Sequence, residues 1–168
     1  MPSDEMDLLI VPAQESQLGL ILSFVRKLAE YEHLADKVIA DEETLRESLF
    51  GARPTAEVVL AYLGREPAGF AVFFHNFSTF EGRPGIYLED LFVEQEHRGR
   101  GVGKALLAYL AKLATDRNCT RLDWAVLDWN RPAIDFYQSL GARAMNDWRI
   151  FRLTGPALEE LAEAGRPL

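Results

Sequence analysis

The sequence places an acidic pair, Glu89 and Asp90, shortly before a turn of arginines and glycines that runs from Arg98 to Gly103. Glycine has no Cβ atom, so the main chain of such a turn can bend sharply and come close to a ligand. The first N–H groups of a helix that begins there have no partner within the helix and lie at the positive end of its dipole. This combination predicts a site for a phosphate group, with an ordinary tight turn as the alternative.

The spacing of this turn limits the kind of phosphate compound that it could bind. The turn reads Arg-x-x-Gly-x-Gly from Arg98 to Gly103, which differs from the Gly-x-x-x-x-Gly-Lys-Ser/Thr pattern of nucleotide P-loops. It also lacks the third glycine of the dinucleotide-binding pattern Gly-x-Gly-x-x-Gly, because Leu106 stands at that place.

The residues on either side of the turn predict the elements that position it. Residues 87–93 have the pattern of an apolar strand that carries the acidic pair, and residues 102–118 have that of an amphipathic helix. Alternating apolar residues predict a further strand over residues 121–127. A strand–helix–strand unit of this length predicts a parallel strand pair with a right-handed crossover, and a ligand at the carboxyl end of the first strand.

The rest of the chain predicts an antiparallel meander with two helices before the strand–helix–strand unit, and two helices and a strand after it. The pattern before it predicts a strand at 7–11, helices at 16–31 and 41–50, and strands at 56–63 and 69–77 joined by a turn at 64–67. The pattern after it predicts a helix at 131–140 between the cap Asn130 and Gly141, a strand at 145–153 and a helix at 156–164. We find no internal repeat in the sequence and expect one domain over residues 1–168.

The composition excludes several classes of protein. A chain of 168 residues that is 48% hydrophobic can bury a core. Its 18 basic and 26 acidic residues give a net charge of −8, which argues against nucleic acid as a partner and favours a cationic substrate. No apolar run approaches the length of a membrane span, and the acidic start does not resemble a secretory signal. We therefore expect a cytoplasmic protein that has no membrane partner.

The cysteine and the histidines give little sign of metal or thiol chemistry. The single Cys119 excludes an internal disulfide, and we interpret it as a filler before a buried strand, with a catalytic thiolate as the alternative. The spacings of His33, His75 and His97 fit no pattern of metal ligands, so we expect solvated or capping roles and no metal site.

The turn matches the acetyl-CoA-binding motif of the GNAT superfamily of N-acetyltransferases, Gln/Arg-x-x-Gly-x-Gly/Ala, at Arg98, Gly101 and Gly103. The predicted order of elements resembles the fold of that superfamily over essentially the whole chain. The resemblance implies an α/β (α+β) fold in which helices flank a mixed, mostly antiparallel sheet, with a parallel pair at the cofactor site. It also implies acetyl-CoA as co-substrate, bound by Leu91, Phe92, Val93, Arg98, Gly99, Arg100, Gly101, Val102, Gly103, Lys104, Asn130 and Tyr137.

Four fragments resemble the spermidine/spermine (diamine) N-acetyltransferase branch, which includes thialysine acetyltransferases. They are Leu-Ala-x-Tyr-Glu at 28–32, Tyr-Leu-Glu-Asp-x-Phe-Val at 87–93, Trp-Asn-x-Pro-x-Ile-x-Phe-Tyr at 129–137, and Gly-Ala at 141–142. The segments at 62–69 and 146–148 are shorter than in the animal enzymes of this branch, and both can border the acceptor cavity. The resemblance therefore leaves the choice of amine open.

The chemistry of such a transfer assigns roles to the acidic pair. An alkylammonium has a pKa near about 10, so the enzyme must remove a proton before the amine can attack a thioester. Glu89 is the candidate base, directly or through a water, with a structural strand carboxylate as the alternative. Asp90 ranks second and could orient the ammonium or the first helix. Main-chain N–H groups near Phe92 and Val93 can polarise the thioester carbonyl.

Aromatic residues complete the candidate site. A tyrosine stays protonated at neutral pH, so Tyr137 could donate a proton to the departing CoA thiolate, with core packing beside Phe136 as the alternative. The resemblance implies that Asn130 lies by the CoA chain and Tyr137 at the sulfur. For the acceptor, carboxylates and aromatic faces attract cations, and surface or core packing is the alternative. The predicted substrate-binding residues are Tyr31, Glu32, Glu89, Asp90, Trp129 and Trp148.

Three functions agree with these patterns. The first is an acetyl-CoA-dependent N-acetyltransferase that acts on a small cationic amine, namely a polyamine, a diamine or a lysine-like amino acid such as thialysine. The second is the same reaction on a protein or peptide amine. The third is a non-catalytic module that binds acyl-CoA as a sensor, although the joint presence of Glu89 and Tyr137 favours catalysis. The resemblance also implies a homodimer.

Overall fold

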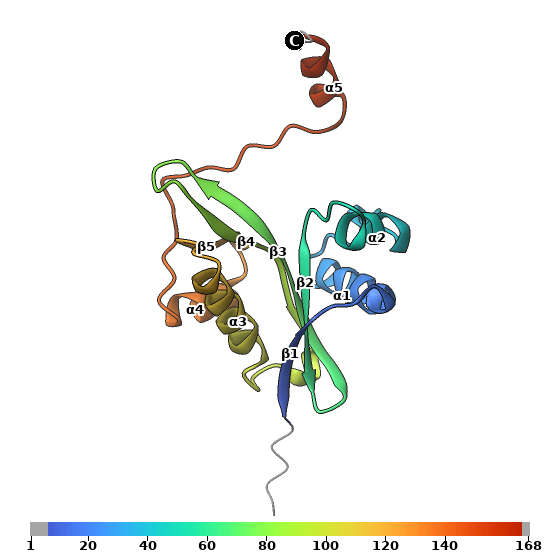
Figure 1. The fold of residues 1–168 in the computed structure, drawn as a ribbon, viewed down its shortest axis with the longest axis vertical. Coiled ribbons are helices and arrows are strands. Elements are labelled where there is room, and N and C mark those ends of the chain that lie inside the picture. Colours follow the sequence, from blue (N-terminus) through green and yellow to red (C-terminus); the bar gives the residue numbers. More distant parts are fainter. Residues whose placement is uncertain (1–6, 166–168) are drawn as a thin grey trace, which may run out of the picture. The chain divides into compact units, whose positions relative to one another are not determined.

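The computed structural model describes residues 7–165, which form two compact units, residues 7–127 and 128–165 (Figure 1). The first unit contains a five-stranded sheet and three α-helices, and the second contains two α-helices. The expectation of a single domain stays a prediction. No described helix is long and apolar enough to cross a membrane.

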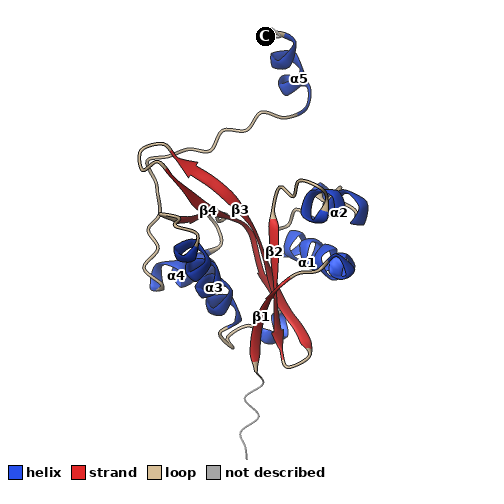
Figure 2. Cartoon of the chain, in the orientation of Figure 1, coloured by secondary structure: helices blue, strands red, loops and turns tan. Residues whose placement is uncertain are grey.

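The sheet has the order β1-β2-β3-β4-β5 (Figure 2), with bounds Leu8–Pro12, Glu57–Leu63, Glu66–Ser78, Arg83–Val93 and Leu122–Trp124. Neighbouring strands from β1 to β4 are antiparallel, and β4 pairs with β5 in parallel. This confirms the predicted mixed, mostly antiparallel sheet with one parallel pair. The β2–β3 turn is shorter than predicted because β3 already begins at Glu66, while Gly64 turns the chain at φ +60°.

Helices cover both sides of this sheet. In Figure 1, α1 (Leu18–Tyr31) and α2 (Glu42–Phe50) lie on one side and α3 (Val102–Asp116) lies on the other. A buried cluster joins α1 to residues of β2, β3 and β4, which is the packing expected for one face of a sheet. Its buried members are Ile21, Phe24, Leu28, Val58, Leu60, Phe70 and Phe92.

Caps define several helix ends as the sequence predicts. The Asp41 side chain accepts a hydrogen bond from the Thr44 N–H at 2.8 Å, which fixes the start of α2. In the second unit, the Asn130 side chain accepts one from the Ala133 N–H at 3.4 Å at the start of α4 (Arg131–Ser139). Gly141 follows that helix at φ +91°, as a C-terminal glycine should.

The predicted strand at 145–153 is wrong, because no strand is present among the described residues of the second unit. Residues such as Ile150 and Phe151, which are 77% and 91% exposed, have strand-forming side chains. A strand also needs a pairing partner, and in the described structure no strand pairs with residues 145–153. Two other bounds differ: β5 is shorter than the predicted strand at 121–127, and the last helix is α5 (Gly155–Glu163).

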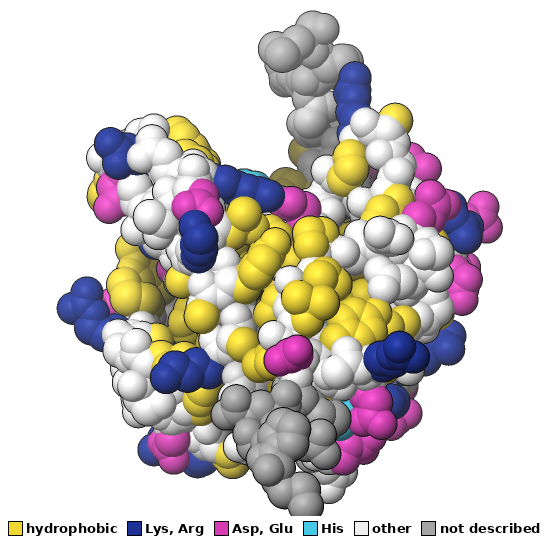
Figure 3. All heavy atoms as spheres, turned by 60° about the horizontal axis from the view of Figure 1, so that its bottom comes forward, with side chains coloured by type: hydrophobic (Ala, Val, Ile, Leu, Met, Phe, Trp, Pro, Cys, Tyr) yellow, Lys and Arg dark blue, Asp and Glu magenta, His cyan; other side chains and the backbone are white. Residues whose placement is uncertain are grey.

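Charge is mixed over the surface in Figure 3. Hydrophobic side chains gather near the middle of that face, and basic and acidic side chains lie mainly around them. The net charge of −8 is therefore not gathered in one block on this face.

Candidate active site

The acidic pair lies at a β-bulge in β4. Val72 on β3 pairs with Asp90, whereas the next residue, Phe73, pairs with Leu88, so Glu89 is an extra residue on β4. A bulge of this kind changes the direction of the side chains that follow it. The Glu89 side chain is exposed, and that of Asp90 is half-buried. The bulge therefore allows two consecutive acidic residues to reach one region.

The carboxyl-terminal half of β4 has an open edge. β5 pairs with β4 only from Ile86 to Leu88, and no other strand of the described chain pairs with that edge. The Glu94 N–H donates to the Ala68 carbonyl on the β3 side at 2.9 Å, so the N–H groups of Val93 and Leu91 face the open edge by alternation. These two N–H groups are free of strand partners on that side in the described sheet, and their role toward a ligand stays a prediction.

The main-chain N–H group of Phe92 faces β3, whereas those of its neighbours Leu91 and Val93 face the open edge. Phe92 pairs with Phe70 on β3, and its ring is packed in the core against Phe24. Among the predicted residues 91–93, Leu91 and Val93 are therefore better placed than Phe92 to donate main-chain hydrogen bonds to a thioester carbonyl.

The glycine turn follows β4 and leads into α3. Gly99 and Gly101 have φ values of +74° and +82°, in the left-handed region that favours glycine, and Gly101 is the residue before the first turn of α3. A Cβ atom at either glycine would meet no atom within 4 Å, so the space beside them is open. The N–H groups of Val102, Gly103 and Lys104 lie in the first turn of α3, where a helix leaves such groups without partners. This geometry fits a phosphate group.

Arg98 connects the turn to β4 and to α1. Its Nε atom donates to the Val93 carbonyl at 3.0 Å, and its guanidinium carbon lies 4.9 Å from the Tyr31 ring centre and 5.7 Å from that of Phe92. Cation–π contacts of this length stabilise the arrangement of the groups that make them. Arg98, predicted as a cofactor ligand, is therefore positioned first of all as a link between neighbouring elements.

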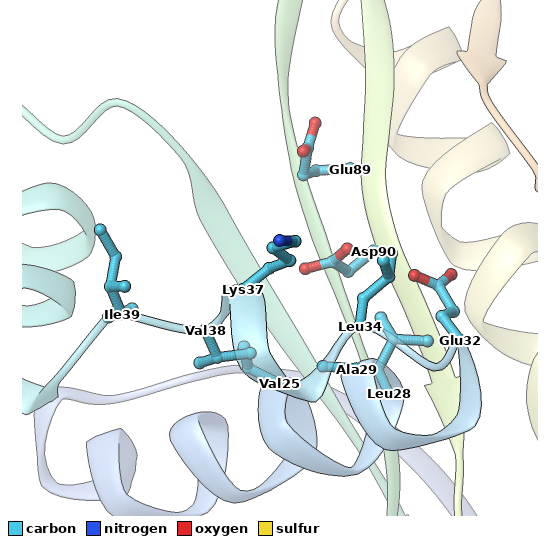
Figure 4. Close-up of a pocket in the computed structure, with 11 residues that line it drawn as sticks. Val25, Leu28, Ala29, Glu32, Leu34, Lys37, Val38, Ile39, Glu89 and Asp90 are labelled. Carbon is cyan, nitrogen blue, oxygen red and sulfur yellow. The ribbon is translucent and has the colours of Figure 1, made fainter. Parts of the chain in front are cut away.

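A cavity of about 390 Å³ lies in the first unit between α1, residues 34–40 and β4 (Figure 4). We name it the acceptor cavity. Three carboxylates line it, those of Glu32, Glu89 and Asp90, together with one lysine, Lys37. The rest of its wall is apolar: Val25, Leu28, Ala29, Leu34, Val38, Ile39 and Ala40. A volume of this size suits a small molecule.

The surroundings of the cavity favour the protonated form of Asp90. Burial first, and then the negative charges of Glu89 and Glu32, raise the pKa of Asp90 to about 6. Burial also raises the pKa of Glu32. A group of carboxylates that repel one another favours a bound cation, since a positive charge relieves the repulsion.

The structure brings together some of the predicted acceptor residues and not others. Glu32, Glu89 and Asp90 share the acceptor cavity, whereas Tyr31 packs under Arg98. Trp129 and Trp148 belong to the second unit, where both are exposed. Lys37 was not predicted as a site residue, because its only signal in the sequence is its place in the polar connection between α1 and α2.

The predicted proton donor and the predicted CoA-chain ligand also belong to the second unit. Tyr137 lies on α4, half-buried, with its ring centre 5.5 Å from that of Phe136. Asn130 is the residue that caps the same helix. Their roles, like that of Glu89, stay predictions.

His97 and Cys119 make contacts that are typical of structural residues. The buried His97 has Nε2 3.6 Å from a Glu66 carboxylate oxygen and Nδ1 3.4 Å from Arg100 Nη1, which indicates a structural role. Cys119 lies just before β5, with its N–H donating to the Ala114 carbonyl at 2.8 Å. Within residues 7–165 no group of three or more His, Cys, Asp or Glu side chains could hold a metal ion.

Comparison with known proteins decides the family. The profile of the acetyltransferase (GNAT) family matches residues 24–142, which include the glycine turn, the bulge and α4. The chain belongs to the GNAT family. It is an N-acetyltransferase, and the enzymes of this family use acetyl-CoA as co-substrate. The resemblance drawn from the sequence is therefore confirmed.

Two relatives are similar to this chain over most of their length. A thialysine N-epsilon-acetyltransferase from Bos taurus is 39% identical, and the similarity covers 92% of this chain and 96% of that protein. An L-ornithine N5-acetyltransferase from Arabidopsis thaliana is 29% identical, over 89% of this chain and 85% of that protein.

Solved structures support the GNAT fold. An integron cassette protein from V. cholerae has a TM-score of 0.79 and 31% identity, over 94% of this chain and 99% of that one. An aminoglycoside acetyltransferase from a soil metagenome has a TM-score of 0.73 at 21% identity, over 88% of this chain and 95% of that one, and shows the fold alone.

Proposed function

We propose that this GNAT enzyme transfers an acetyl group from acetyl-CoA to a primary amine of a small cationic acceptor, namely a polyamine, a diamine or a lysine-like amino acid such as thialysine. The observation that carries the proposal is the acceptor cavity, where Glu32, Glu89 and Asp90 lie together beside the strand that has an open edge. The names of the relatives, which are thialysine and ornithine N-acetyltransferases, support the same class of acceptor.

The binding of the acceptor follows from the charges of the cavity. The ammonium groups of the acceptor lie against the three carboxylates, and its methylene groups lie against the apolar wall formed by residues such as Leu28 and Val38. Carboxylates attract ammonium ions most strongly where the surroundings are partly shielded from water, as they are at Asp90.

Acetyl-CoA supplies an activated acetyl group as a thioester, with a pyrophosphate at the other end of its pantetheine chain. The turn at residues 98–103 and the first turn of α3 fit the pyrophosphate, because they offer main-chain N–H groups at a helix N-terminus. The N–H groups of Leu91 and Val93 fit the thioester carbonyl, because they face the open edge of β4.

The transfer needs one base and one acid. Glu89 accepts a proton from the ammonium, directly or through a water, so that the amine nitrogen can attack the carbonyl carbon. A C–N bond forms, and the C–S bond breaks. Tyr137 donates a proton to the CoA thiolate as it leaves, so each proton has a donor and an acceptor. The cavity, about 390 Å³, can hold a small acceptor, and the assay below distinguishes this from a protein or peptide amine.

The decisive experiment measures acetyl-CoA consumption with spermidine, putrescine, thialysine, lysine and a lysine-containing peptide. We expect turnover with at least one of the small amines and little with the peptide. Tyr137→Phe should lower kcat by about a hundredfold, because it removes the proton donor. Tyr109→Phe, on α3 and outside the predicted site, is the matched control. Full turnover by Tyr137→Phe on every accepted amine would show that Tyr137 is not the donor.

Three further features of the enzyme rest on the sequence and stay predictions. They are the homodimer, the cytoplasmic location, and the absence of nucleic acid, membrane and metal as partners. Size-exclusion chromatography with light scattering tests the first of them, since a monomeric mass at working concentration would contradict the homodimer.

A further inference from the structure

One cation lines the acceptor cavity, although the cavity is otherwise acidic and apolar. Lys37 lies on η2 (Ala35–Lys37), a short turn of helix between α1 and α2. In Figure 4 its side chain extends toward the strand that carries Glu89 and Asp90. A purely cationic acceptor gains nothing from an ammonium at this place, because like charges repel.

The Lys37 ammonium is available to a ligand. Its one ion pair in the described part of the chain is with the adjacent Asp36, at 3.1 Å, and both side chains are 72% exposed. Exposed pairs of this kind are weak, so a ligand can replace or share the contact at little cost. None of the carboxylates of the cavity forms an ion pair with Lys37 in the described structure.

We propose that Lys37 binds the carboxylate of the acceptor, so that the enzyme prefers α-amino acids with a terminal amine over diamines and polyamines of equal length. The inference rests on the proposed function, because it assigns a specificity residue to the same cavity. Two ammonium groups of such an amino acid lie against the carboxylates of Glu32, Glu89 and Asp90, and its one carboxylate lies against Lys37. Each charged group of the acceptor then has a partner of opposite sign.

The apolar wall agrees with this acceptor. Leu34, Val38 and Ile39 belong to the same connection as Lys37 and line the same cavity. Ile39 is 94% exposed, so a bound methylene chain would cover apolar surface that water otherwise contacts. An acceptor with charged groups and a short hydrocarbon chain matches a wall that combines charges at Glu89, Asp90 and Lys37 with apolar residues beside them.

The test compares three acceptors that differ at one group. Lysine and cadaverine have the same carbon chain between the amines and differ by the carboxylate, and lysinamide replaces that carboxylate with a neutral amide. We expect Lys37→Met to lower kcat/KM for lysine about five- to tenfold and to change the values for cadaverine and lysinamide less than about twofold. Lys37→Arg keeps the positive charge and should keep most of the preference for lysine.

Lys112→Met is the matched control, because Lys112 is 76% exposed, pairs with one aspartate, Asp116, and lies on α3 away from the cavity lining. It should leave all three values unchanged. If wild type acetylates these amines but Lys37→Met lowers all three values equally, or lowers none, the role of Lys37 is overturned and the proposed function stands. If wild type acetylates no small amine with acetyl-CoA, the proposed function fails and the inference fails with it.

Discussion

The glycine turn at residues 98–103 and the acceptor cavity are made from different parts of the polypeptide. The turn offers main-chain N–H groups from one continuous segment, and it depends on two glycines, Gly99 and Gly101, at positive φ. The cavity offers side chains from three separate segments, α1, residues 34–40 and β4. A site made of main chain keeps its chemistry when neighbouring side chains change, whereas a site made of side chains changes with each of them. One cofactor can therefore be common to a family whose acceptors differ.

The largest effect should come from the cavity, at Glu89. Glu89→Gln should lower kcat about a hundredfold near neutral pH and move the pH–rate profile to more alkaline pH, because the reaction then depends on amine that is already deprotonated. A pH series of initial rates measures this. Glu81→Gln, in the loop between β3 and β4, is the control. An unchanged profile would rule out Glu89 as the base and leave the cavity with a binding role only.

A smaller effect should come from the turn, at Gly101. Gly101→Val should weaken CoA binding about thirtyfold, because a β-branched residue at φ +82° is strained and must move the main chain that binds phosphate. Calorimetric titration with CoA measures the affinity.

The control for this change is Gly82→Val, in the loop between β3 and β4, because Gly82 also has positive φ (+63°) with no atom within 4 Å of an added Cβ. It should lower the melting temperature by a similar amount and leave CoA affinity unchanged. Normal CoA binding by Gly101→Val would show that the turn is not the phosphate site.

Asp90 should give a change of a few fold that depends on pH. Its pKa is raised to about 6, so it ionises as the pH rises through that value, and only the ionised form attracts an ammonium. KM for the amine should therefore fall about fivefold between roughly pH 5 and pH 7 in the wild type. Asp90→Asn should remove most of this dependence, whereas Asp116→Asn on α3 should retain it. An Asp90→Asn enzyme with the wild-type dependence would contradict the assignment.

The same residue links pH to stability. The pKa of Asp90 is higher in the folded protein than in the unfolded chain, so the folded state holds the proton more tightly and its stability falls as the pH rises from about 4 to about 6. Relative to wild type, Asp90→Asn should therefore gain about 2 kcal/mol in the free energy of unfolding over that interval. Urea unfolding at a series of pH values measures the gain, and parallel curves for the two proteins would contradict it.

The smallest effect should come from Arg98, which joins the two regions. Arg98→Met should lower the free energy of unfolding by about 1 kcal/mol, because it removes the hydrogen bond to Val93 and the contacts with two rings. Acetyl-CoA affinity should weaken less than about threefold. Arg65→Met, in the exposed β2–β3 turn, is the control. A large loss of affinity at unchanged stability would instead make Arg98 a phosphate ligand.

The sequence was more informative about the turn than about the cavity for a physical reason. The turn is local: its glycines, its arginine and the amphipathic helix that follows are adjacent in the chain, so their pattern predicts their structure. Lys37 was not predicted as a site residue, because it lines the cavity only when α1 and β4 pack beside its segment. No local sequence pattern shows that packing. The bulge at Glu89 was also not predicted, although two adjacent acidic residues on an apolar strand are a sign of an irregularity at that place.

The errors in secondary structure have a similar origin. Residues 145–153 have side chains that favour a strand, but a strand exists only when another chain segment pairs with it. Helix starts were predicted well, as at Asp41 and Asn130, because caps are made by neighbours in sequence. Local information therefore gave the helices and the glycine turn, and non-local contacts decided the sheet edges and the acceptor cavity.

The extra residue at Glu89 has a consequence for the variation of this enzyme. Leu88 pairs with β5 on one side of the bulge, and Phe92 packs in the core on the other. Deletion of Glu89 would leave Leu88 opposite Phe73 and Asp90 opposite Val72 in a regular ladder, so the later residues of β4 would keep their faces and the cavity would lose one carboxylate. The core and the pairing with β5 therefore do not need the extra residue, and its effect is to add a second acidic side chain beside Asp90 at the cavity.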